Sequence, residues 1–172
     1  PKDFDCCTDL TPDEMLALSA AHSRFEVIPT GLKHGTVTLH SKVSNNSYEI
    51  TTFRADGDYS DHRHPNSVEF SKSLEEDLKR RDLTINSFAV EILHCDEGLD
   101  LYMLDESYYY DLQYGIIRAV GDPRKRFEED ALRMLRAIRF AAQLGFTLDT
   151  DTFKKKKKKA STIQFVSRER IR

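Results

Sequence analysis

The sequence has no tryptophan, few cysteines and no long apolar run. Its three cysteines are Cys6, Cys7 and Cys95, and their odd number and spacing suit no metal site. We therefore expect reduced thiols and a cytoplasmic protein. No stretch approaches the roughly 18 apolar residues that a membrane-spanning helix needs, and none resembles a signal peptide. These absences predict that no membrane is among the partners.

Charge is abundant but unevenly placed along the chain. Asp, Glu, Lys and Arg make up 32% of the 172 residues, and the formal net charge is -3. This total does not favour nucleic-acid binding, yet Arg and Lys are concentrated from Arg118 onward, and a local basic surface is what an RNA partner would need. The first residue is Pro and the last residues read as an interrupted helix. We expect one domain and the start of a second, as part of a longer protein.

Two aspartates near the start of the chain are the first candidates for chemistry. Asp3 and Asp5 flank Phe4, and on a strand this spacing puts both carboxylates on one face. Convergent carboxylates repel one another unless a cation lies between them, and Mg²⁺ prefers such oxygen ligands. Glu49, on a strand predicted over residues 48–54, could supply a third carboxylate. A solvated strand end for the aspartates and an exposed edge-strand position for Glu49 remain open alternatives.

Local signals predict the neighbouring elements. Thr11-Pro-Asp-Glu14 is typical of a capped helix start, so we expect a helix to about His22. Strands are predicted over residues 25–28 and 36–40. Residues 55–70 are polar and rich in turn formers, which predicts a loop. The His and Asp residues of this loop lack the spacing of a zinc site.

Another polar group follows a short helix predicted over residues 73–82. Arg81 suits a phosphate, while Asp82 and Asn86 suit ribose hydroxyls. A pair of arginines at a helix end, followed by a buried and hydrogen-bonded Asn, would explain the same residues without a ligand.

The stretch from Arg126 to Phe140 predicts one amphipathic helix, which is entered through Gly121-Asp-Pro123 and stopped at Gly145. Apolar side chains recur at helical spacing on one face, which comprises Phe127, Ala131, Met134, Leu135, Ile138 and Ala142. The opposite face is dense in charge and comprises Arg126, Glu129, Asp130, Arg133 and Arg136. Either this face is a solvated surface with ion pairs worth about 0.2–0.5 kcal/mol each, or it binds a ligand.

Several motifs occur in a characteristic order along the chain. They are Pro1-Lys-Asp-Phe-Asp5, Thr11-Pro-Asp-Glu14, Lys33-His-Gly-Thr36, Tyr48-Glu-Ile-Thr-Thr-Phe-Arg54, Tyr59, Asp61, Arg63-His-Pro65, Arg80-Arg-Asp-Leu-Thr-Ile-Asn86, Arg118-Ala-Val-Gly-Asp-Pro123 and Glu129-Asp-x-x-Arg133. With them the chain resembles class II tRNA nucleotidyltransferases, which are CCA-adding enzymes, and the related bacterial poly(A) polymerases. The resemblance runs almost from end to end, and its last two motifs are highly specific.

The resemblance implies a metal-dependent catalytic site and a nucleotide site. Asp3 and Asp5 match the family's paired aspartates, which bind Mg²⁺, and Glu49 lies on the strand that often carries a third carboxylate. Contacts to the nucleotide's ribose, phosphates and base are implied for Arg81, Asp82, Asn86, Asp130, Arg133, Arg136 and Arg139. Arg139 lies off the charged helical face, so its role rests on the resemblance alone.

Asp130 and Arg133 match the two residues that read the base in place of a nucleic-acid template. Cytosine and adenine each present an amino donor beside a ring-nitrogen acceptor. A carboxylate can accept from the amino group while a guanidinium donates to the ring nitrogen, whereas uracil and guanine present the reverse pattern. We expect each failed contact to cost about 1–3 kcal/mol.

The chain departs from the family pattern in four respects. The Gly-Gly-x-x-Arg segment that holds the triphosphate upstream of Asp3 is missing, and so are the body and tail domains that grip tRNA. The hinge segment Asp105–Leu112 lacks its usual glycine and is shortened. Lys154–Lys159 replaces an ordinary neck helix, and we expect six adjacent lysines to be disordered or a tail.

The loop at 55–70, in contrast, has full length, which in the family accompanies A addition.

The sequence thus predicts an α/β (α+β) protein with two domains. Residues 1–121 form a polymerase-β-like nucleotidyltransferase head with a small mixed sheet, incomplete at its start. Residues 122–172 form an all-helical neck, incomplete at its end. The implied function is the addition of C and A to the tRNA 3′ end from CTP and ATP, with release of pyrophosphate. A poly(A) polymerase and an inactive RNA-binding fragment are the alternatives.

Overall fold

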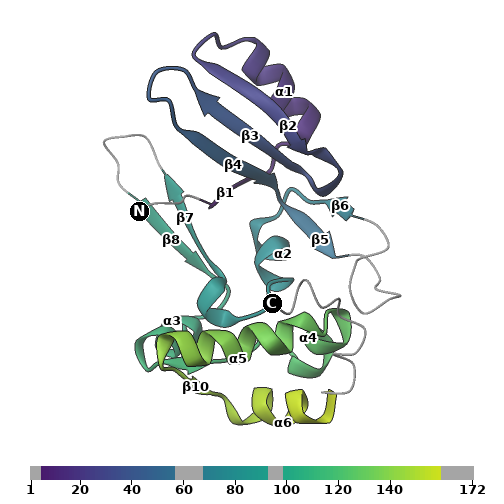
Figure 1. Ribbon diagram of the computed structural model, residues 1–172, viewed down its shortest axis with the longest axis vertical. Helices are drawn as coiled ribbons and strands as arrows, with labels where there is room; N and C mark the ends of the chain where they lie inside the picture. Colours follow the sequence, from purple (N-terminus) through teal and green to yellow (C-terminus); the bar gives the residue numbers. More distant parts are fainter. Residues whose placement is uncertain (1–4, 57–67, 93–98, 160–172) are drawn as a thin grey trace. The chain divides into compact units, whose positions relative to one another are not determined.

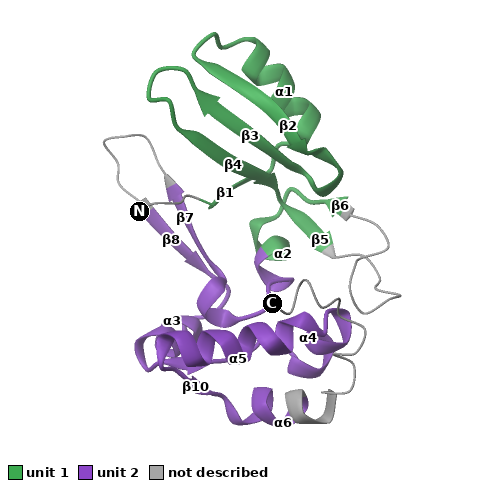
Figure 2. Cartoon of the chain, in the orientation of Figure 1, with its two compact units in different colours: residues 1–57, 67–77 green, residues 58–66, 78–172 purple. Residues whose placement is uncertain are grey.

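The computed structural model describes residues 5–56, 68–92 and 99–159 (Figure 1). The chain forms two compact units (Figure 2): unit 1 contains residues 1–57 and 67–77, and unit 2 contains residues 58–66 and 78–172. Asp3 and most of the loop predicted at 55–70 lie outside the described residues. The prediction for Asp3 therefore stays a prediction, and so does the domain boundary at residues 121 and 122.

Unit 1 is built on a four-stranded sheet with the strand order β1-β4-β3-β2. Its strands are β1 (Asp5–Thr8), β2 (Phe25–Gly31), β3 (Thr36–Ser41) and β4 (Ser47–Thr52), and the 3₁₀ turn η1 (Leu32–His34) joins β2 to β3. β1 runs parallel to β4, whereas the β2–β3 and β3–β4 pairs are antiparallel. The small mixed sheet predicted from the sequence is confirmed.

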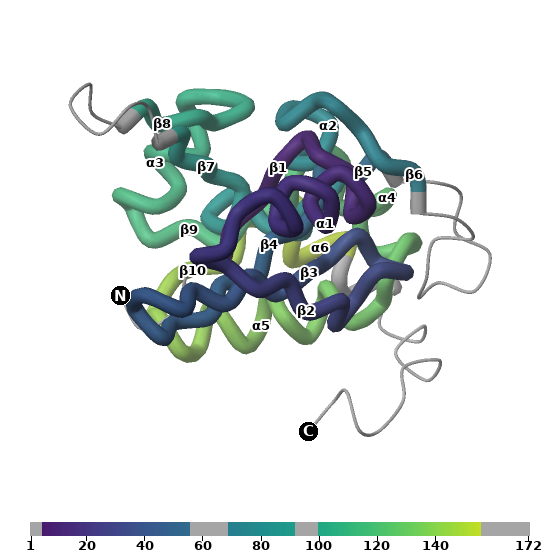
Figure 3. Tube along the Cα trace, turned by 90° about the horizontal axis from the view of Figure 1, so that it is seen from above, coloured from purple at the N-terminus to yellow at the C-terminus, as the bar shows by residue number. Residues whose placement is uncertain are grey.

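Helix α1 (Pro12–Ala20) contacts β2 and β3 (Figure 3). Its capping box is complete: the Glu14 carboxylate accepts the Thr11 N–H at 2.7 Å, and Thr11 Oγ1 accepts the Glu14 N–H at 3.3 Å. Pro12 stands in the first turn, where its missing N–H leaves no helical hydrogen bond unmade. The predicted start is confirmed, but the helix ends at Ala20 rather than near His22.

The strand predicted over residues 48–54 is two strands in the structure. β4 ends at Thr52, and β5 (Arg54–Asp56) forms an antiparallel pair with β6 (Val68–Phe70). Phe53 lies between them and donates its N–H to the carbonyl of Thr8 at 2.7 Å. Both ends of the predicted loop at 55–70 are therefore strands, because pairing with a distant segment satisfies their backbone groups.

Unit 2 combines short helices with two small strand pairs. With α2 (Leu74–Lys79), whose last two residues belong to this unit, its elements are η2 (Thr84–Asn86), β7 (Phe88–Ile92), β8 (Leu99–Met103), α3 (Ser107–Gln113), β9 (Ile116–Ile117), α4 (Pro123–Glu129), α5 (Leu132–Leu144), β10 (Thr147–Leu148) and α6 (Thr150–Lys159). The β7–β8 pair is antiparallel and the β9–β10 pair is parallel. The segment predicted to be all-helical from residue 122 thus also contributes a strand, β10.

The core of unit 2 includes two buried clusters. Their members are Phe127, Ala131 and Met134 in the first, and Leu83, Ile117 and Ala137 in the second. α4 and α5 contribute to these clusters, so burial of their apolar side chains stabilises the helices in place. The predicted apolar face is only partly right, because Ile138 and Ala142 are exposed.

The stretch predicted as one helix from Arg126 to Phe140 is two helices, α4 and α5. The break lies at Asp130, whose φ of -142° and ψ of 112° are extended. Asp130 Oδ1 accepts the N–H of Leu132 at 2.8 Å. Aspartate side chains compete in this way with the helical hydrogen bonds of the backbone, which explains why a continuous apolar period did not produce a continuous helix.

The two outer ends of this helical stretch follow their sequence signals. Asp122 caps α4, because its Oδ1 accepts the N–H of Arg124 at 2.8 Å, and Pro123 takes the first helical position. α5 ends at Gly145, which adopts a left-handed φ of 69° that favours glycine. The predicted start and stop are both confirmed.

The lysine run is helical as far as Lys159. α6 is capped at its start by Asp149, whose Oδ2 accepts the N–H of Thr152 at 3.0 Å. The prediction that Lys154–Lys159 are disordered is therefore wrong for their backbone. In the described parts of the chain, neither this helix nor any other is long and apolar enough to cross a membrane.

Candidate active site

Two carboxylates of the predicted site lie on adjacent strands of unit 1. Asp5 on β1 is the register partner of Glu49 on β4 in their parallel pair. Residues directly opposite each other on neighbouring strands present their side chains on the same face of the sheet. Both residues are exposed. The structure therefore brings together Asp5 and Glu49, which are far apart in the sequence.

This pair is chemically suited to a hard divalent cation. Mg²⁺ takes oxygen ligands and is usually held by one or two carboxylates together with substrate phosphates. Asp5 and Glu49 supply two such carboxylates on one exposed face. Within residues 5–56, 68–92 and 99–159, no group of three or more His, Cys, Asp or Glu side chains could hold a metal ion. The oxygen donors fit Mg²⁺, and Asp3 remains the predicted further ligand.

The thiol of Cys6, beside these carboxylates, is poorly suited to act as a nucleophile. Cys6 follows Asp5 on β1, and burial raises the pKa of its thiol, which the negative charge of Asp5 raises further. A thiol with a raised pKa stays protonated at neutral pH, and the thiolate is the reactive form. The chemistry of this strand therefore depends on its carboxylates.

In unit 2, the segment from Arg81 to Asn86 folds back on itself. Nη1 of Arg81 donates to the carbonyl of Asn86 at 3.2 Å, and the N–H of Asn86 donates to the carbonyl of Leu83 at 3.0 Å. Asp82 is buried, and its Oδ1 accepts the N–H of Leu83 at 3.0 Å. Arg81, Asp82 and Asn86, which the sequence predicts to hold one nucleotide, are thus parts of one compact turn.

The same turn is tied to α5 by an ion pair. Nε of Arg136 donates to Oδ2 of Asp82, whose side chain is 10% exposed, whereas that of Arg136 is 38% exposed. A charge-assisted contact of this kind fixes both groups more firmly than a neutral hydrogen bond does. The structure therefore joins two predicted nucleotide-binding residues that come from different motifs.

The side chain of Arg133 is held by Glu129, for which the sequence predicted no functional role. Its Nη1 donates to Oε2 of Glu129, and its Nη2 donates to the carbonyl of Arg80 at 3.2 Å. Glu129 also pairs with Arg126, and both are buried, so this part of the predicted charged face is not a solvated surface. The spacing of i,i+3 to Arg126 and i,i+4 to Arg133 was the available signal for this cluster.

Asp130 and Arg133 are close in the chain but do not share one helix. Asp130 adopts extended backbone angles at the end of α4, and Arg133 lies in the first turn of α5. The N–H of Arg133 donates to the carbonyl of Asp130 at 3.1 Å, so a single turn still keeps the two residues together. The prediction that they lie on one face of one helix is therefore wrong in its geometry, while their proximity is retained.

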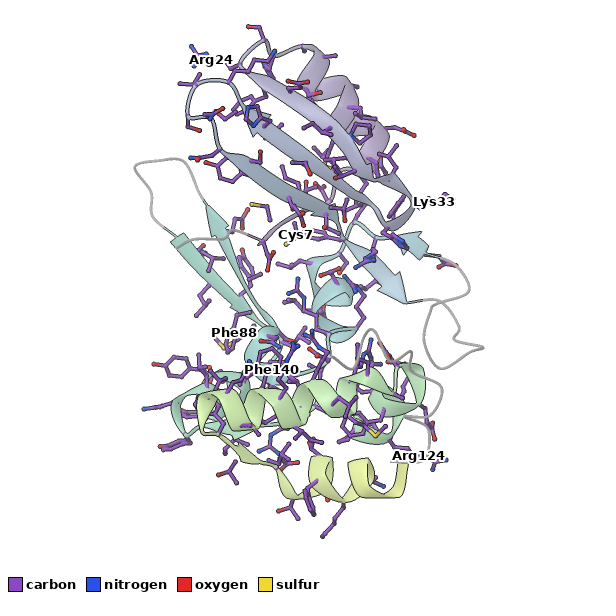
Figure 4. All side chains as sticks on the ribbon, viewed as in Figure 1. Cys7, Arg24, Lys33, Phe88, Arg124 and Phe140 are labelled. Atoms are coloured by element: carbon purple, nitrogen blue, oxygen red, sulfur yellow. The ribbon has the colours of Figure 1, made fainter. Side chains whose placement is uncertain are left out.

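Arg136 and Arg139 meet at an aromatic ring. The guanidinium carbon of each lies 5.5 Å from the ring centroid of Phe140, which is labelled in Figure 4. A cation over an aromatic face is attracted to it and is restricted in orientation. Arg139, which helical spacing placed off the charged face, is exposed and shares this ring with Arg136.

A partly buried network joins this turn to part of the predicted hinge segment. Asp111 on α3 is 2% exposed and accepts hydrogen bonds from Thr84 Oγ1 at 2.9 Å and from Arg118 Nε at 3.0 Å. Arg118 also pairs with Asp149 at 3.0 Å. The hydrogen bond to Asp111 raises the pKa of the Arg118 guanidinium, so this cation is permanent. The network connects η2, which carries Asn86, to α3 and α6.

The sequence of this chain matches a known protein family. Residues 1–118 match the family described as the Poly A polymerase head domain. The matched part includes the carboxylates of unit 1 and the turn from Arg81 to Asn86.

Individual relatives resemble the chain over nearly its whole length. The CCA-adding enzyme of Lactobacillus helveticus (strain DPC 4571) is 47% identical over 170 residues, which are 99% of this chain and 39% of that protein. The CCA-adding enzyme of Ligilactobacillus salivarius (strain UCC118) is 44% identical over 169 residues, which are 98% of this chain and 39% of that protein. The chain thus spans 39% of the length of these relatives.

A solved structure resembles the fold. The crystal structure of the Bacillus stearothermophilus CCA-adding enzyme in complex with CTP aligns with a TM-score of 0.80 at 38% sequence identity. The alignment covers 98% of this chain and 37% of that one. The mixed sheet and the helices that follow it therefore have a counterpart in a protein that binds CTP.

Proposed function

Since the chain belongs to the Poly A polymerase head domain family, we propose that this protein is a tRNA nucleotidyltransferase that adds C and A to the tRNA 3′ end. CTP and ATP are the donors, and pyrophosphate is released. The observation that carries this proposal is the similarity to CCA-adding enzymes, which extends over 98% to 99% of the chain.

In this proposal Asp3 and Asp5 would hold Mg²⁺, and Glu49 would supply a third carboxylate beside them. Such an ion would lower the pKa of the attacking hydroxyl and offset negative charge on the transferred phosphoryl group. The 3′-oxygen of the RNA forms a bond to the α-phosphorus, the bond from that phosphorus to the α,β-bridging oxygen breaks, and pyrophosphate leaves. The shared face of Asp5 and Glu49 supports the role of these carboxylates as ligands.

The turn after α2 serves the nucleotide's sugar and phosphates. Arg81 binds a phosphate, while Asp82 and Asn86 bind ribose hydroxyls, and Arg136 and Arg139 add positive charge. The support is that Arg81 contacts Asn86, that Asp82 contacts Arg136, and that each is therefore held in a defined place. Positioning of this kind supplies much of the catalysis in phosphoryl transfer.

Asp130 and Arg133 select the base. The Asp130 carboxylate accepts from the amino group of cytosine or adenine, and the Arg133 guanidinium donates to the neighbouring ring nitrogen. The close approach of the two residues at the junction of α4 and α5 supports this pairing.

The proposal also covers the partner, the domains and the compartment. The RNA partner is the tRNA 3′ end, and the protein acts in the cytoplasm. Residues 1–121 act as the head domain, and residues 122–172 belong to the neck.

One incorporation experiment distinguishes this function from its alternatives. The full-length protein is incubated with Mg²⁺, labelled CTP and a tRNA that lacks its 3′ CCA, and then with ATP. Addition of two C residues followed by one A is the expected result. Long A tracts without a need for CTP would instead identify a poly(A) polymerase. Binding of the tRNA without incorporation of either nucleotide would identify an RNA-binding protein.

A further inference from the structure

A buried ion cluster lies on α4 and at the start of α5. Arg126 and Glu129 are 8% and 7% exposed. Nη2 of Arg126 binds Oε1 of Glu129 at 2.9 Å, and Oε2 of Glu129 accepts from Arg133. One carboxylate is therefore shared by two guanidiniums. Because an unpaired buried charge is costly, we expect the loss of one member to make the others pair differently.

The same two guanidiniums bind the backbone that leads into the turn at Arg81. Nη1 of Arg126 donates to the carbonyl of Lys79 at 3.2 Å, and Nη2 of Arg133 donates to the carbonyl of Arg80 at 3.2 Å. Two consecutive carbonyls are thus bound by two members of one cluster. The side chains of both arginines are thereby fixed at two points each, at Glu129 and at this backbone.

Arg133 keeps donors available while it is held. A guanidinium carries five N–H donors in one rigid plane. Nη1 of Arg133 donates to Glu129 and to the carbonyl of Arg126. Nη2 donates to the carbonyl of Arg80. Within the part of the chain that the structure describes, these contacts use three of the five donors. Arg133 can therefore contact a base without leaving the cluster.

We propose that Arg126 is a positioning residue for base selection, which acts through Glu129 to set the orientation of Arg133. This inference rests on the proposed nucleotidyltransferase function. Arg126 itself does not contact the nucleotide; it completes the pairing of Glu129, and Glu129 in turn fixes the guanidinium that reads the base. Donors held in advance in the required orientation discriminate between substrates better than mobile ones do.

The test compares C with U incorporation by full-length protein and its variants. In Arg126→Met, the ratio of kcat/KM for CTP to that for UTP is expected to fall about tenfold, because Arg133 loses its fixed orientation. Arg126→Lys is expected to lose less, since a lysine can still pair with Glu129 at i,i+3. In a Glu129→Gln background, Arg126→Met is expected to cause no further fall, because the residue through which it acts has already been changed.

The matched control is Arg124 on the same helix, whose side chain is 64% exposed and pairs with Glu128 at 3.1 Å (Figure 4). Arg124→Met is expected to keep the parent ratio. Thermal unfolding of every variant is measured as well. If Arg126→Met does not fold, Arg126→Lys is compared in the parent and in the Glu129→Gln background instead.

Two results would overturn the inference alone. One is an equal loss of kcat/KM for CTP and UTP in Arg126→Met, which is what a purely structural role produces. The other is a fall of the CTP-to-UTP ratio in the double variant that equals, in free energy, the sum of the falls in the two single variants. A parent protein that incorporates neither nucleotide would instead overturn the proposed function, and this inference with it.

Discussion

Nε of Arg136 donates a hydrogen bond to Oδ2 of Asp82, which lies 54 residues earlier in the chain. The other carboxylate oxygen of Asp82 accepts the N–H of Leu83 at 3.0 Å. Both oxygens of Asp82 are therefore engaged within unit 2, one by the turn itself and one by α5. It follows that the nucleotide-binding roles proposed for Asp82 and Arg136 depend on each other.

Replacement of Asp82 tests how much its two contacts stabilise the fold. Asp82→Ala is expected to lower the free energy of unfolding by about 1–3 kcal/mol, because Leu83 N–H and the Arg136 guanidinium both lose an acceptor. Asp82→Asn is expected to lose less, since its amide oxygen can still accept from Leu83. Urea unfolding monitored by circular dichroism measures both values. Equal stability of Asp82→Ala and the parent would contradict the role of this contact.

Replacement of the facing carboxylates tests the proposed metal site. Asp5→Asn is expected to lower kcat about a hundredfold to a thousandfold, as the loss of an electrostatic contact in a transition state does. Glu49→Gln is expected to lower it less, about tenfold, and excess Mg²⁺ is expected to restore part of the activity. Both residues are exposed, so the unfolding midpoint should not change. Glu26, an exposed carboxylate on β2 of the same sheet, provides the control Glu26→Gln, and an equal loss there would argue against a specific site.

Asp130 can be changed without removing the hydrogen bond that its side chain accepts. Asp130→Asn keeps an oxygen that can accept the N–H of Leu132, so stability is expected to change by less than about 1 kcal/mol. Its amide can donate to the carbonyl of uracil, so the preference for C and A over U and G is expected to fall about tenfold. Single-nucleotide incorporation with each of the four triphosphates measures the preference. An unchanged profile would remove Asp130 from base selection.

The lowered pKa of the Asp149 carboxyl predicts how the stability of the folded protein depends on pH. Burial raises the pKa of this carboxyl, but the hydrogen bonds from Thr152 and the positive charge of Arg118 outweigh burial and leave the pKa below its ordinary value. Because the unfolded carboxyl has the higher pKa, of about 3.9, ionised Asp149 stabilises the folded protein above that pH. This contribution is lost as the pH falls through the lower pKa of the folded state.

The variant Asp149→Asn isolates this contribution. Between about pH 5 and about pH 2, the unfolding temperature of Asp149→Asn is expected to fall less steeply than that of the parent. At neutral pH the variant is expected to be the less stable of the two. Parallel curves for the two proteins would show that Asp149 is not the group responsible.

Local signals in the sequence predicted the ends of several elements correctly. The capping box of α1 joins Thr11 to Glu14, only three residues away, so its whole chemistry is visible in the sequence. Gly145 ends α5 because a left-handed φ there favours glycine whatever the rest of the chain does. The prediction missed the break at Asp130, because the apolar period continues across it. The hydrogen bond from Leu132 N–H to the Asp130 carboxylate competes with the helix only locally.

By itself, the sequence determined the order of the motifs, the presence of a mixed sheet followed by helices, and the residue types available for chemistry. Only the tertiary structure decided that Glu49 faces Asp5, that Arg136 reaches Asp82, and that Glu129 is buried with two arginines. The physical reason is distance along the chain. Caps and helical periods depend on residues within about one turn of each other, whereas strand register and the pairing of buried charges depend on segments that only the folded chain brings together.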